Sequence, residues 1–359
     1  MKKKLLFTAY NLDIGGIEKS LINLLDNINY DKYEVTLILE KKEGIFLDKL
    51  NKNVILKELK VSSSKNIILR KMINFYRKLI FKLKNNNKYD FSCCYATYSY
   101  SCSKLALIGS KNSALYVHSD YTNLYNKEQY LEFFNTRNID KFKHIIFVSN
   151  ESKKSFLKYY PNLDKKTLVF NNFVDTNDII RKSEEKTELP KPKNKKLLVF
   201  IGRLDDSSKK LFRAINLVKN INDLYLWIIG DGPDKEKYVD KVKTENLNNR
   251  IVFLGQKNNP YNYLNQADYL ILTSDYEGFP VTFLEAIVLN KKIITTIDVS
   301  DEIIQIGKNY GYIISKDENK MIEEVKNILK EDKKTKTVDF DKIQEERMKN
   351  LEKIFDEVI

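Results

Sequence analysis

Short apolar runs alternate with stretches of helical spacing along the whole sequence. The runs that predict strands lie at 4–10, 34–40, 54–59, 114–118, 144–149, 167–170, 196–201, 224–230, 250–254, 269–273 and 292–296. Helical spacing is found at 16–27, 233–246 and 279–289. Strands that alternate with helices of about ten residues or more favour βαβ units and parallel sheets. The pattern therefore predicts an α/β fold.

The alternation is interrupted by the polar segment 181–196. This segment contains Pro190 and Pro192 and few residues that could enter a core, which is typical of a stiffened linker. We therefore expect two doubly wound, Rossmann-like lobes over 1–180 and 197–336, and a terminal helix over 337–359. Such sheets bind ligands at the carboxyl ends of their strands, so the cleft between two lobes is the expected site.

The segment 59–89 departs from this pattern because it combines apolar and basic residues and has no acidic one. Its basic residues include Lys65, Arg70, Lys71, Arg77, Lys78, Lys82, Lys84 and Lys88. A helix of this composition suits the surface of an anionic membrane, with Arg70, Lys71, Arg77 and Lys78 as its contacts. The alternative is an ordinary helix of the first lobe with a solvated basic face.

Charge is unevenly distributed over the 359 residues. Residues 1–190 hold 33 basic and 21 acidic side chains, so nearly all of the net charge of +13 lies in the first half. Such a charge attracts phosphates, nucleic acid or an anionic membrane. No nucleic-acid motif is present and the charge follows an apolar segment, so nucleic acid is not an expected partner.

No apolar run approaches the ~20 residues that a spanning helix needs. The basic start is interpreted as a first strand and not as a secretory signal. Cys93, Cys94 and Cys102 are too few and too clustered for a disulfide framework, and no Cys/His set has zinc spacing. A reducing, cytoplasmic location without a bound metal is the resulting expectation.

Two turns that follow predicted strands suit an anionic ligand. Gly15 and Gly16 open a helix, where backbone N–H groups can approach an anion. Arg203 and Lys209 lie after the first strand of the second lobe and could clamp a diphosphate. The alternative for these two cations is simple exposure to solvent.

A third turn, at 273–286, carries the strongest signal. Glu277 lies on the loop, Gly278 gives access to the backbone, Pro280 starts a helix and Glu285 lies inside that helix among apolar residues. The two carboxylates could each hold a pair of sugar hydroxyls, and the N–H groups between them could meet phosphate. Glu285 as an exposed helical residue is the alternative, since a buried carboxylate needs a partner.

The pair Glu277 and Glu285, within Glu-Gly-Phe-Pro-x-x-x-Leu-Glu-Ala, resembles the retaining GT-B glycosyltransferases of family 4. Further matching segments stand in the family's order: Gly15-Gly16, Val117-His118-Ser119-Asp120, Val148-Ser149, Asn171-Asn172-Phe173-Val174-Asp175, Gly202-Arg203-Leu204 with Lys209, Gly230-Asp231-Gly232-Pro233 and Phe253-Leu254-Gly255. The resemblance covers essentially the whole chain. Lys210 stands where the family often has glycine, so either Lys209 or Lys210 could clamp the diphosphate.

The resemblance implies a GT-B fold, two lobes facing across a cleft, with a nucleotide-sugar donor on the second lobe. Arg203 and Lys209 would bind the donor diphosphate and stabilise charge on the leaving group. Glu285 would hold the ribose hydroxyls, and Glu277 would contact the transferred sugar. His118, from the first lobe, would reach that sugar near the reacting carbon. The implied catalytic residues are thus His118, Arg203, Lys209 and Glu277.

The remaining donor-binding residues implied by the resemblance are Gly15, Gly16, Gly255, Gln256, Gly278, Phe279 and Pro280. Attack on the same face as the leaving phosphate would retain the anomeric configuration, so the paired acid and base of glycoside hydrolysis is not expected. No metal or other cofactor is expected, and a UDP-sugar is preferred over GDP- and ADP-sugars as the co-substrate.

The resulting hypothesis is a bacterial hexosyltransferase at the cytoplasmic membrane. It would extend a polyprenyl-diphosphate-linked glycan at the inner leaflet, in the synthesis of a capsule, an exopolysaccharide or teichoic acid. The alternatives are an epimerase-like or phosphorylase-like enzyme of the same fold, a nucleic-acid-binding protein, and a non-catalytic scaffold.

Overall fold

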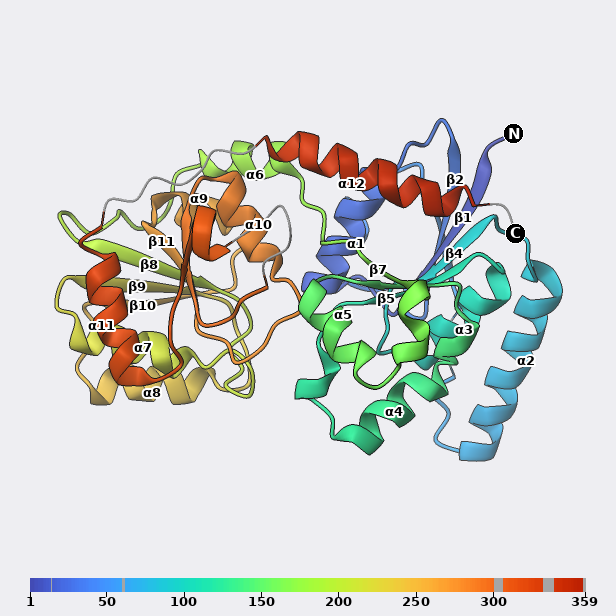
Figure 1. The fold of residues 1–359 in the computed structure, drawn as a ribbon, viewed down its shortest axis with the longest axis horizontal. Coiled ribbons are helices and arrows are strands. Elements are labelled where there is room, and N and C mark those ends of the chain that lie inside the picture. The colour runs from blue at the N-terminus through green and yellow to red at the C-terminus, as the bar shows by residue number, and fades with distance from the viewer. Residues whose placement is uncertain (14, 60–61, 300–305, 332–338, 358–359) are drawn as a thin grey trace. The chain divides into compact units, whose positions relative to one another are not determined.

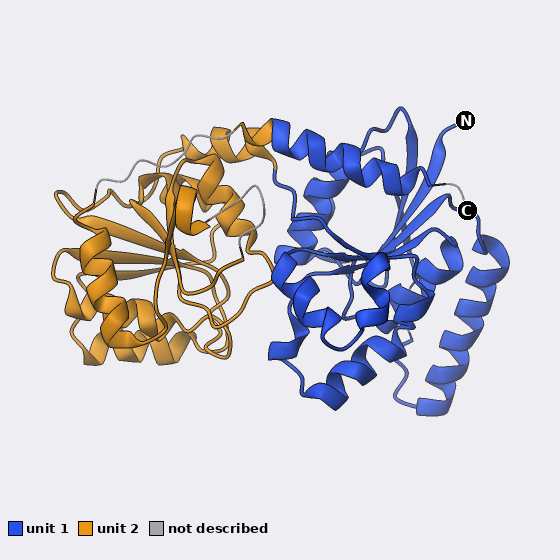
Figure 2. Ribbon diagram, in the orientation of Figure 1, with its two compact units in different colours: residues 1–174, 342–359 blue, residues 175–341 orange. Residues whose placement is uncertain are grey.

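The computed structural model describes residues 1–13, 15–59, 62–299, 306–331 and 339–357 (Figure 1). The chain forms two compact units, one of residues 1–174 with 342–359 and one of residues 175–341 (Figure 2). Each unit has its own sheet of parallel strands with helices packed on it. The predicted α/β class with two doubly wound sheets is confirmed.

The first unit contains seven parallel strands in the order β3-β2-β1-β4-β5-β6-β7. They are β1 (Lys3–Ala9), β2 (Tyr33–Leu39), β3 (Ile55–Glu58), β4 (Phe91–Cys94), β5 (Ser113–Val117), β6 (His144–Phe147) and β7 (Thr167–Val169). The helices are α1 (Gly16–Asp26), α2 (Ile67–Asn85), α3 (Tyr100–Gly109), α4 (Lys127–Thr136), α5 (Asn150–Leu157) and the last helix, α12 (Phe340–Phe355). Short 3-10 turns lie at Leu47–Lys49, Tyr121–Asn123, Ile139–Lys141 and Pro161–Lys166. The strand order reverses between β1 and β4, which makes this the switch point of the sheet.

The second unit contains six parallel strands in the order β10-β9-β8-β11-β12-β13. They are β8 (Lys196–Ile201), β9 (Leu224–Ile229), β10 (Ile251–Gly255), β11 (Tyr269–Leu272), β12 (Lys292–Thr295) and β13 (Gly311–Ile313). The helices are α6 (Thr176–Ser183), α7 (Leu211–Asn220), α8 (Lys235–Thr244), α9 (Tyr261–Gln266), α10 (Val281–Val288) and α11 (Glu318–Ile328), and a π turn covers Ile306–Tyr310. The strand order reverses here between β8 and β11.

The central strands are apolar on both faces because helices cover both faces of each sheet. Leu5 and Leu6 of β1 and Leu198 and Val199 of β8 are fully buried. Strands covered on both faces do not alternate between apolar and polar residues. They therefore appear in the sequence as continuous apolar runs, from which the strands were predicted.

The sequence pattern missed β4, the strand that lies next to β1 in the sheet. Its four residues, Phe91 to Cys94, include a serine and two cysteines, so no apolar run marks it. All four are buried. The Ser92 hydroxyl is satisfied there by donating to the carbonyl of Ala106 at 2.7 Å. Burial of small polar residues with internal partners is invisible to a hydropathy pattern.

The division into units differs from the predicted linker at 181–196. The structure divides the chain between Val174 and Asp175, because α6 packs on α9 and α10 of the second unit. Residues 181–196 are polar because they run along the surface of that unit, where Lys191 pairs with Asp268 at 2.7 Å. The terminal helix returns to the first unit, where the Phe355 ring lies 4.7 Å from the ring of Phe91.

Across the described ranges, none of the helices combines the length and the apolar character needed to cross a membrane.

Candidate active site

The loops after β8 and β11 meet at the switch point of the second sheet. The backbone N–H of Asp275 donates to the carbonyl of Ser208 at 2.8 Å, and the Thr273 hydroxyl donates to the carbonyl of Lys210 at 2.9 Å. These bonds join two loops that lie more than sixty residues apart in sequence. Functional side chains on both loops are therefore held at one edge of the sheet, where α/β sheets bind ligands.

Lys209 and Glu277 form an ion pair across these two loops. The Lys209 Nζ lies 2.5 Å from Glu277 Oε1, which also accepts a hydrogen bond from the Ser274 hydroxyl at 2.7 Å. Both side chains are mostly shielded, with exposed fractions of 19% and 14%. The lysine stem passes beside Gly202, within 3.8 Å of the position a Cβ would occupy there. The structure thus brings together two residues that the sequence linked only through a family motif.

Lys210 has different partners. Its Nζ lies 3.8 Å from Asp206 and 3.8 Å from Asp275, away from Glu277. Its backbone is left-handed, with φ of 49° and ψ of 44°, where glycine is favoured over other residues. Of the two candidate lysines, Lys209 is the one that contacts the glutamate of the motif.

Arg203 lies just past β8 and its side chain is exposed. Among the described residues it forms no ion pair, so its guanidinium is available to a ligand. The turn after β9 packs against this loop: a Cβ at Gly230, where φ is 144°, would collide with the Gly202 carbonyl. Glycine there serves close packing beneath the Arg203 loop.

The other residues implied for the donor lie along the same edge. Glu285, inside α10, is only 2% exposed, and Gly278, Phe279 and Pro280 before it are also buried. Gly255 ends β10 with φ of 68°, and nothing lies within 4 Å on its Cβ side. Gln256 follows it and is exposed. All of these residues belong to the second unit.

In the first unit, the Gly15–Gly16 turn lies at the corresponding switch point, between β1 and α1. A Cβ at Gly15 would collide with the Glu18 carboxylate, whereas Gly16 has open space around it. Glu18 accepts a hydrogen bond from the Tyr98 hydroxyl at 3.0 Å, and its burial raises the pKa of this carboxyl above its usual value. The Glu18 carboxylate thus lies directly against the Gly15 backbone.

His118 follows β5 at the same edge of the first sheet and is 7% exposed. Its ring lies 4.5 Å from that of Tyr95 and 4.7 Å from that of Tyr116. Burial lowers the pKa of His118 to about 3, so the imidazole is neutral at physiological pH. Its Nε2 is buried and meets no hydrogen-bond partner among the residues that the structure describes. An imidazole nitrogen of this kind can form a hydrogen bond with a polar ligand.

The sequence missed the residues that surround His118. Tyr95 follows the unrecognised strand β4, and its hydroxyl bonds to Ser20 of α1 at 2.7 Å. Neither residue lies in a motif singled out by the sequence. Had β4 been predicted, the position of Tyr95 directly after that strand would have suggested it as a site residue.

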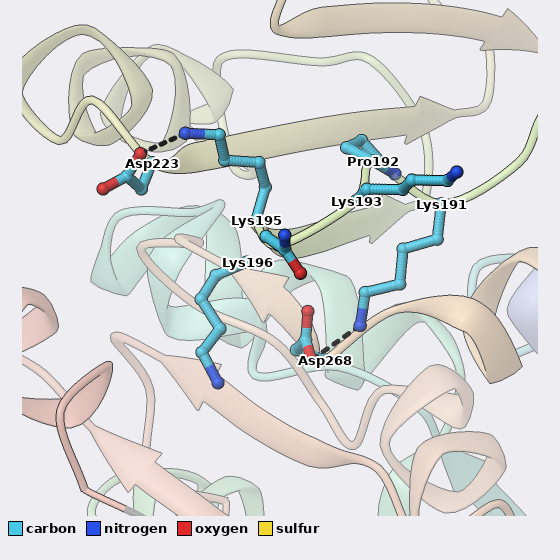
Figure 3. A pocket seen from close by; sticks show the side chains of 8 residues that line it. Lys191, Pro192, Lys193, Lys195, Lys196, Asp223 and Asp268 are labelled. Carbon is cyan, nitrogen blue, oxygen red and sulfur yellow. Dashed lines mark hydrogen bonds and ion pairs between the residues drawn. The ribbon is translucent and has the colours of Figure 1, made fainter.

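A hollow on the second unit lies elsewhere (Figure 3). It is lined by Lys191, Pro192, Lys193, Asn194, Lys195, Lys196, Asp223 and Asp268. Lys196 starts β8, while Asp223 and Asp268 immediately precede β9 and β11, so this hollow lies at the amino ends of the strands. Two of its lysines are paired, Lys191 with Asp268 and Lys195 with Asp223. This is the edge opposite to the one where such sheets bind ligands.

The helix α2 exposes its apolar side chains. Phe81 alone is buried in it, whereas the exposed apolar residues are Ile67, Ile68, Leu69, Met72, Phe75, Tyr76, Leu79, Ile80 and Leu83. Arg70 and Lys71 are exposed, but Arg77 and Lys78 are half-buried, and Lys78 lies 4.7 Å above the ring of Tyr100. Two of the predicted basic contacts are therefore exposed to solvent and two are half-buried.

The described residues include no group of three or more histidine, cysteine, aspartate or glutamate side chains that could hold a metal ion.

Solved structures place this fold among the GT-B glycosyltransferases. The chain resembles Anabaena HepE, crystallised in complex with UDP and glucose, with a TM-score of 0.78 at 16% identity over 99% of this chain and 100% of HepE. It also resembles a mutant of S. aureus TarM crystallised with UDP, with a TM-score of 0.73 at 13% identity over 99% and 100% of the two chains.

Family models identify the chain more narrowly. Residues 14–178 match the model described as Glycosyltransferase Family 4, and residues 181–345 match Glycosyl transferases group 1. Together the two matches cover most of the chain, which therefore belongs to this family of glycosyltransferases. The expected family and GT-B fold are both confirmed.

Two curated relatives carry more specific names. One is the N-acetylgalactosamine-N,N'-diacetylbacillosaminyl-diphospho-undecaprenol 4-alpha-N-acetylgalactosaminyltransferase of Campylobacter jejuni, 26% identical over 376 aligned positions, 95% of this chain and 97% of the relative. The other is the capsular polysaccharide biosynthesis glycosyltransferase CapH of Staphylococcus aureus, 28% identical over 45% of this chain and 46% of the relative.

Proposed function

We propose that this glycosyltransferase moves a sugar from a UDP-sugar to a hydroxyl of a lipid-linked glycan, with retention of configuration, in the synthesis of a surface polysaccharide. The observation that carries the proposal is the Lys209–Glu277 pair at the switch point of the second sheet, with the exposed Arg203 on the same loop as Lys209. Cations can bind the diphosphate of a sugar nucleotide, and a carboxylate can accept hydrogen bonds from the hydroxyls of its sugar.

The second unit supplies the donor contacts in this proposal. Arg203 and Lys209 bind the diphosphate and stabilise the charge that develops on the leaving UDP. Glu277 contacts hydroxyls of the transferred sugar, and Glu285 the ribose. The uracil lies near Gly255 and Gln256, at the open end of β10. UDP is favoured as the nucleotide because HepE and TarM were both crystallised with it.

The proposed sugar transfer breaks one bond, forms one bond and moves one proton, and it needs no oxidant or reductant. The bond between the anomeric carbon and the diphosphate oxygen breaks, and the acceptor oxygen forms a new bond on the same face of the sugar. The acceptor proton passes to the leaving phosphate oxygen. His118, which is neutral and whose Nε2 meets no partner among the described residues, contacts the sugar near the reacting carbon. The backbone of the Gly15–Gly16 turn lines the diphosphate and acceptor side.

The acceptor is proposed to be a polyprenyl-diphosphate glycan at the cytoplasmic face of a membrane. The C. jejuni relative is named for a diphospho-undecaprenol substrate. The solvent-facing side of α2 is apolar, with Met72, Phe75 and Leu83 among its exposed residues and with Arg70 and Lys71 exposed nearby. An apolar helix face bordered by cations suits the interface of an anionic bilayer.

A donor screen tests the proposal. Purified protein is melted with UDP-, GDP- and ADP-sugars, with and without anionic vesicles, and slow donor hydrolysis is followed in parallel. A UDP-sugar should raise the melting temperature and be hydrolysed, because a ligand that binds the folded state stabilises it. Both effects should vanish in Arg203→Ala.

The matched control is Lys193→Ala, which removes a cation at the opposite, amino-terminal edge of the same sheet. It should behave as the wild type. If no nucleotide sugar raises the melting temperature or is hydrolysed under any of these conditions, the chain is a scaffold without the chemistry.

A further inference from the structure

Three aromatic rings form a closed cluster at the switch point of the first sheet. The ring centroids of Tyr95, Tyr116 and His118 lie 4.5 to 4.8 Å from one another. All three residues lie at the ends of neighbouring strands, Tyr95 after β4 and the other two on β5 and just after it. Tyr95 is fully buried, and its ring contacts that of the histidine.

The Tyr95 hydroxyl starts a chain of hydrogen bonds that leads away from His118. It lies 2.7 Å from the Ser20 hydroxyl, which donates to Oδ1 of Asn172 at 2.8 Å. Because the single Ser20 proton is used toward Asn172, the Tyr95 hydroxyl must donate to Ser20. Ser20 is fully buried and Asn172 is 5% exposed. A buried chain with this fixed direction locks the tyrosine against α1.

The series of hydrogen bonds that starts at Tyr95 ends at Asn172, in a segment that is itself held by α12. Asn172 lies two residues before the division between the units, beside Asn171 and Val174. Asn171 accepts a hydrogen bond from Arg347 of α12 at 3.0 Å, and the Val174 N–H donates to Gln344 of α12 at 2.8 Å. The hydrogen bonds from Tyr95 therefore lead to a segment that the terminal helix α12 also stabilises.

We propose that Tyr95 is a positioning residue that fixes the orientation of the His118 imidazole, and that Ser20 and Asn172 in turn fix Tyr95. The role assigned to the imidazole, contact with the transferred sugar, rests on the proposed function. The ring cluster itself does not. Burial within this cluster also keeps His118 neutral, since the lowered pKa arises from desolvation. A loosened Tyr95 should admit water to the imidazole and allow it to rotate.

The first experiment needs no enzymatic activity. The chain contains only two histidines, so full-length protein labelled with 13C-histidine gives two ring signals, which His144→Gln assigns. In the wild type the His118 signal should not titrate between pH 5 and 8. In Tyr95→Leu it should titrate with a pKa shifted toward the ordinary value of about 6.5. Unchanged protection of His118 in Tyr95→Leu would overturn the proposal.

The second experiment keeps the ring and removes only the hydroxyl chain. Tyr95→Phe and Ser20→Ala should each lower kcat about tenfold and leave KM for the donor within twofold, because Arg203, Lys209 and Glu285, which bind the nucleotide part of the donor in the proposed function, lie on the second unit. Tyr130→Phe, at another buried tyrosine of the first unit, is the matched control and should retain the wild-type kcat.

Failures of the two proposals are distinguishable. Equal kcat in Tyr95→Phe, Ser20→Ala and Tyr130→Phe would overturn the positioning role even if transfer itself is observed. Absence of transfer with every nucleotide sugar would overturn the proposed function, while the titration of His118 would still decide the role of Tyr95. If Tyr95→Leu does not fold, the titrations of Tyr95→Phe and Ser20→Ala replace it: a rise in the pKa of His118 beyond that in Tyr130→Phe supports the proposal, and no rise contradicts it.

Discussion

The two sheets share one plan but carry opposite chemistry at their switch points. In the second unit the loops after β8 and β11 present charges, Arg203 to solvent and Lys209 paired with Glu277. In the first unit the corresponding edge holds a buried, neutral His118 packed against tyrosine rings. The same fold therefore places residues at the carboxyl ends of the strands in both units, and the identity of those residues determines which ligand each edge suits. The charged edge suits a diphosphate, and the neutral edge suits close contact with uncharged groups.

The helices repeat this contrast. In α7 of the second unit the apolar residues Leu211, Leu217 and Val218 are buried. In α2 of the first unit the apolar residues are exposed and Phe81 alone is buried. Helices of one chain obey the same packing rules, so an apolar face left in solvent is typical of a surface that binds a partner, and the membrane contact proposed for α2 rests on this difference.

The largest expected effect breaks the charged edge. Arg203→Ala should lower kcat/KM for sugar transfer by about a hundredfold to a thousandfold, because it removes a donor to charge on the leaving group. Steady-state kinetics with the UDP-sugar from the screen measure this. Lys193→Ala should stay within twofold of the wild type, and an equally small effect of Arg203→Ala would contradict the assignment of the diphosphate site.

The second effect tests the exposed face of α2. Replacing Met72, Phe75 and Leu83 together by serine should weaken binding to vesicles of anionic lipid by about a hundredfold, since three apolar side chains no longer enter the interface. Sedimentation with vesicles measures the partition. Serine at Leu124 and Ile180, which are exposed outside α2, is the control and should leave binding unchanged.

The charges beside that face sharpen the same prediction. Arg70→Gln with Lys71→Gln should weaken binding about tenfold or more, at roughly 1 kcal/mol per charge near the surface, and the loss should shrink as salt rises. Wild-type protein that never sediments with anionic vesicles would remove the membrane contact from the account.

The third effect concerns His118 at the neutral edge and how the stability of the fold changes as pH falls. A histidine with a pKa of about 3 in the folded state and about 6.5 unfolded stabilises the fold above pH 6.5, and this contribution is lost as pH falls from 6.5 toward 3. Between pH 7.5 and 5 the wild type should lose about 2 kcal/mol more unfolding free energy than His118→Gln. Urea unfolding at the two pH values measures the difference, and parallel curves for the two proteins would show that His118 is not buried as a neutral ring.

The smallest effect concerns the backbone beneath the charged edge. Lys210→Gly should stabilise the protein by up to about 1 kcal/mol, because a left-handed backbone strains any residue with a Cβ. The lost contacts to Asp206 and Asp275 are long and partly exposed, so they offset little. Asn290→Gly, at a similar φ of 53°, should gain less because asparagine tolerates this conformation better. Thermal melting compares the two variants, and a destabilised Lys210→Gly would assign the lysine side chain a larger role.

Much of the fold was predictable because buried parallel strands produce continuous apolar runs, and β8 lies at the bounds expected for it. The strand β4 was not, because its serine and cysteines are buried with internal partners. The change of unit at Val174 was also missed, since it is set by packing of α6 and not by composition.

Where a motif names a residue, the sequence offers a candidate for the site. Motif spacing named Arg203, Glu277 and the lysine pair, but only the fold shows that Lys209 contacts Glu277 whereas Lys210 lies near Asp275, because these partners come from another loop. Composition likewise indicated an unusual α2, but not that Arg77 and Lys78 are half-buried. Tertiary contacts of this kind leave no trace in local sequence.

The most direct test of the central claim is a transfer assay on vesicles that carry a polyprenyl-diphosphate glycan, with the UDP-sugar from the screen and 1H NMR of the product. The account predicts one added sugar, one UDP released and the anomeric configuration of the donor retained, with the product lost in Arg203→Ala and kept in Lys193→Ala. Donor binding without any transfer to a supplied acceptor, or a product of inverted configuration, would contradict it.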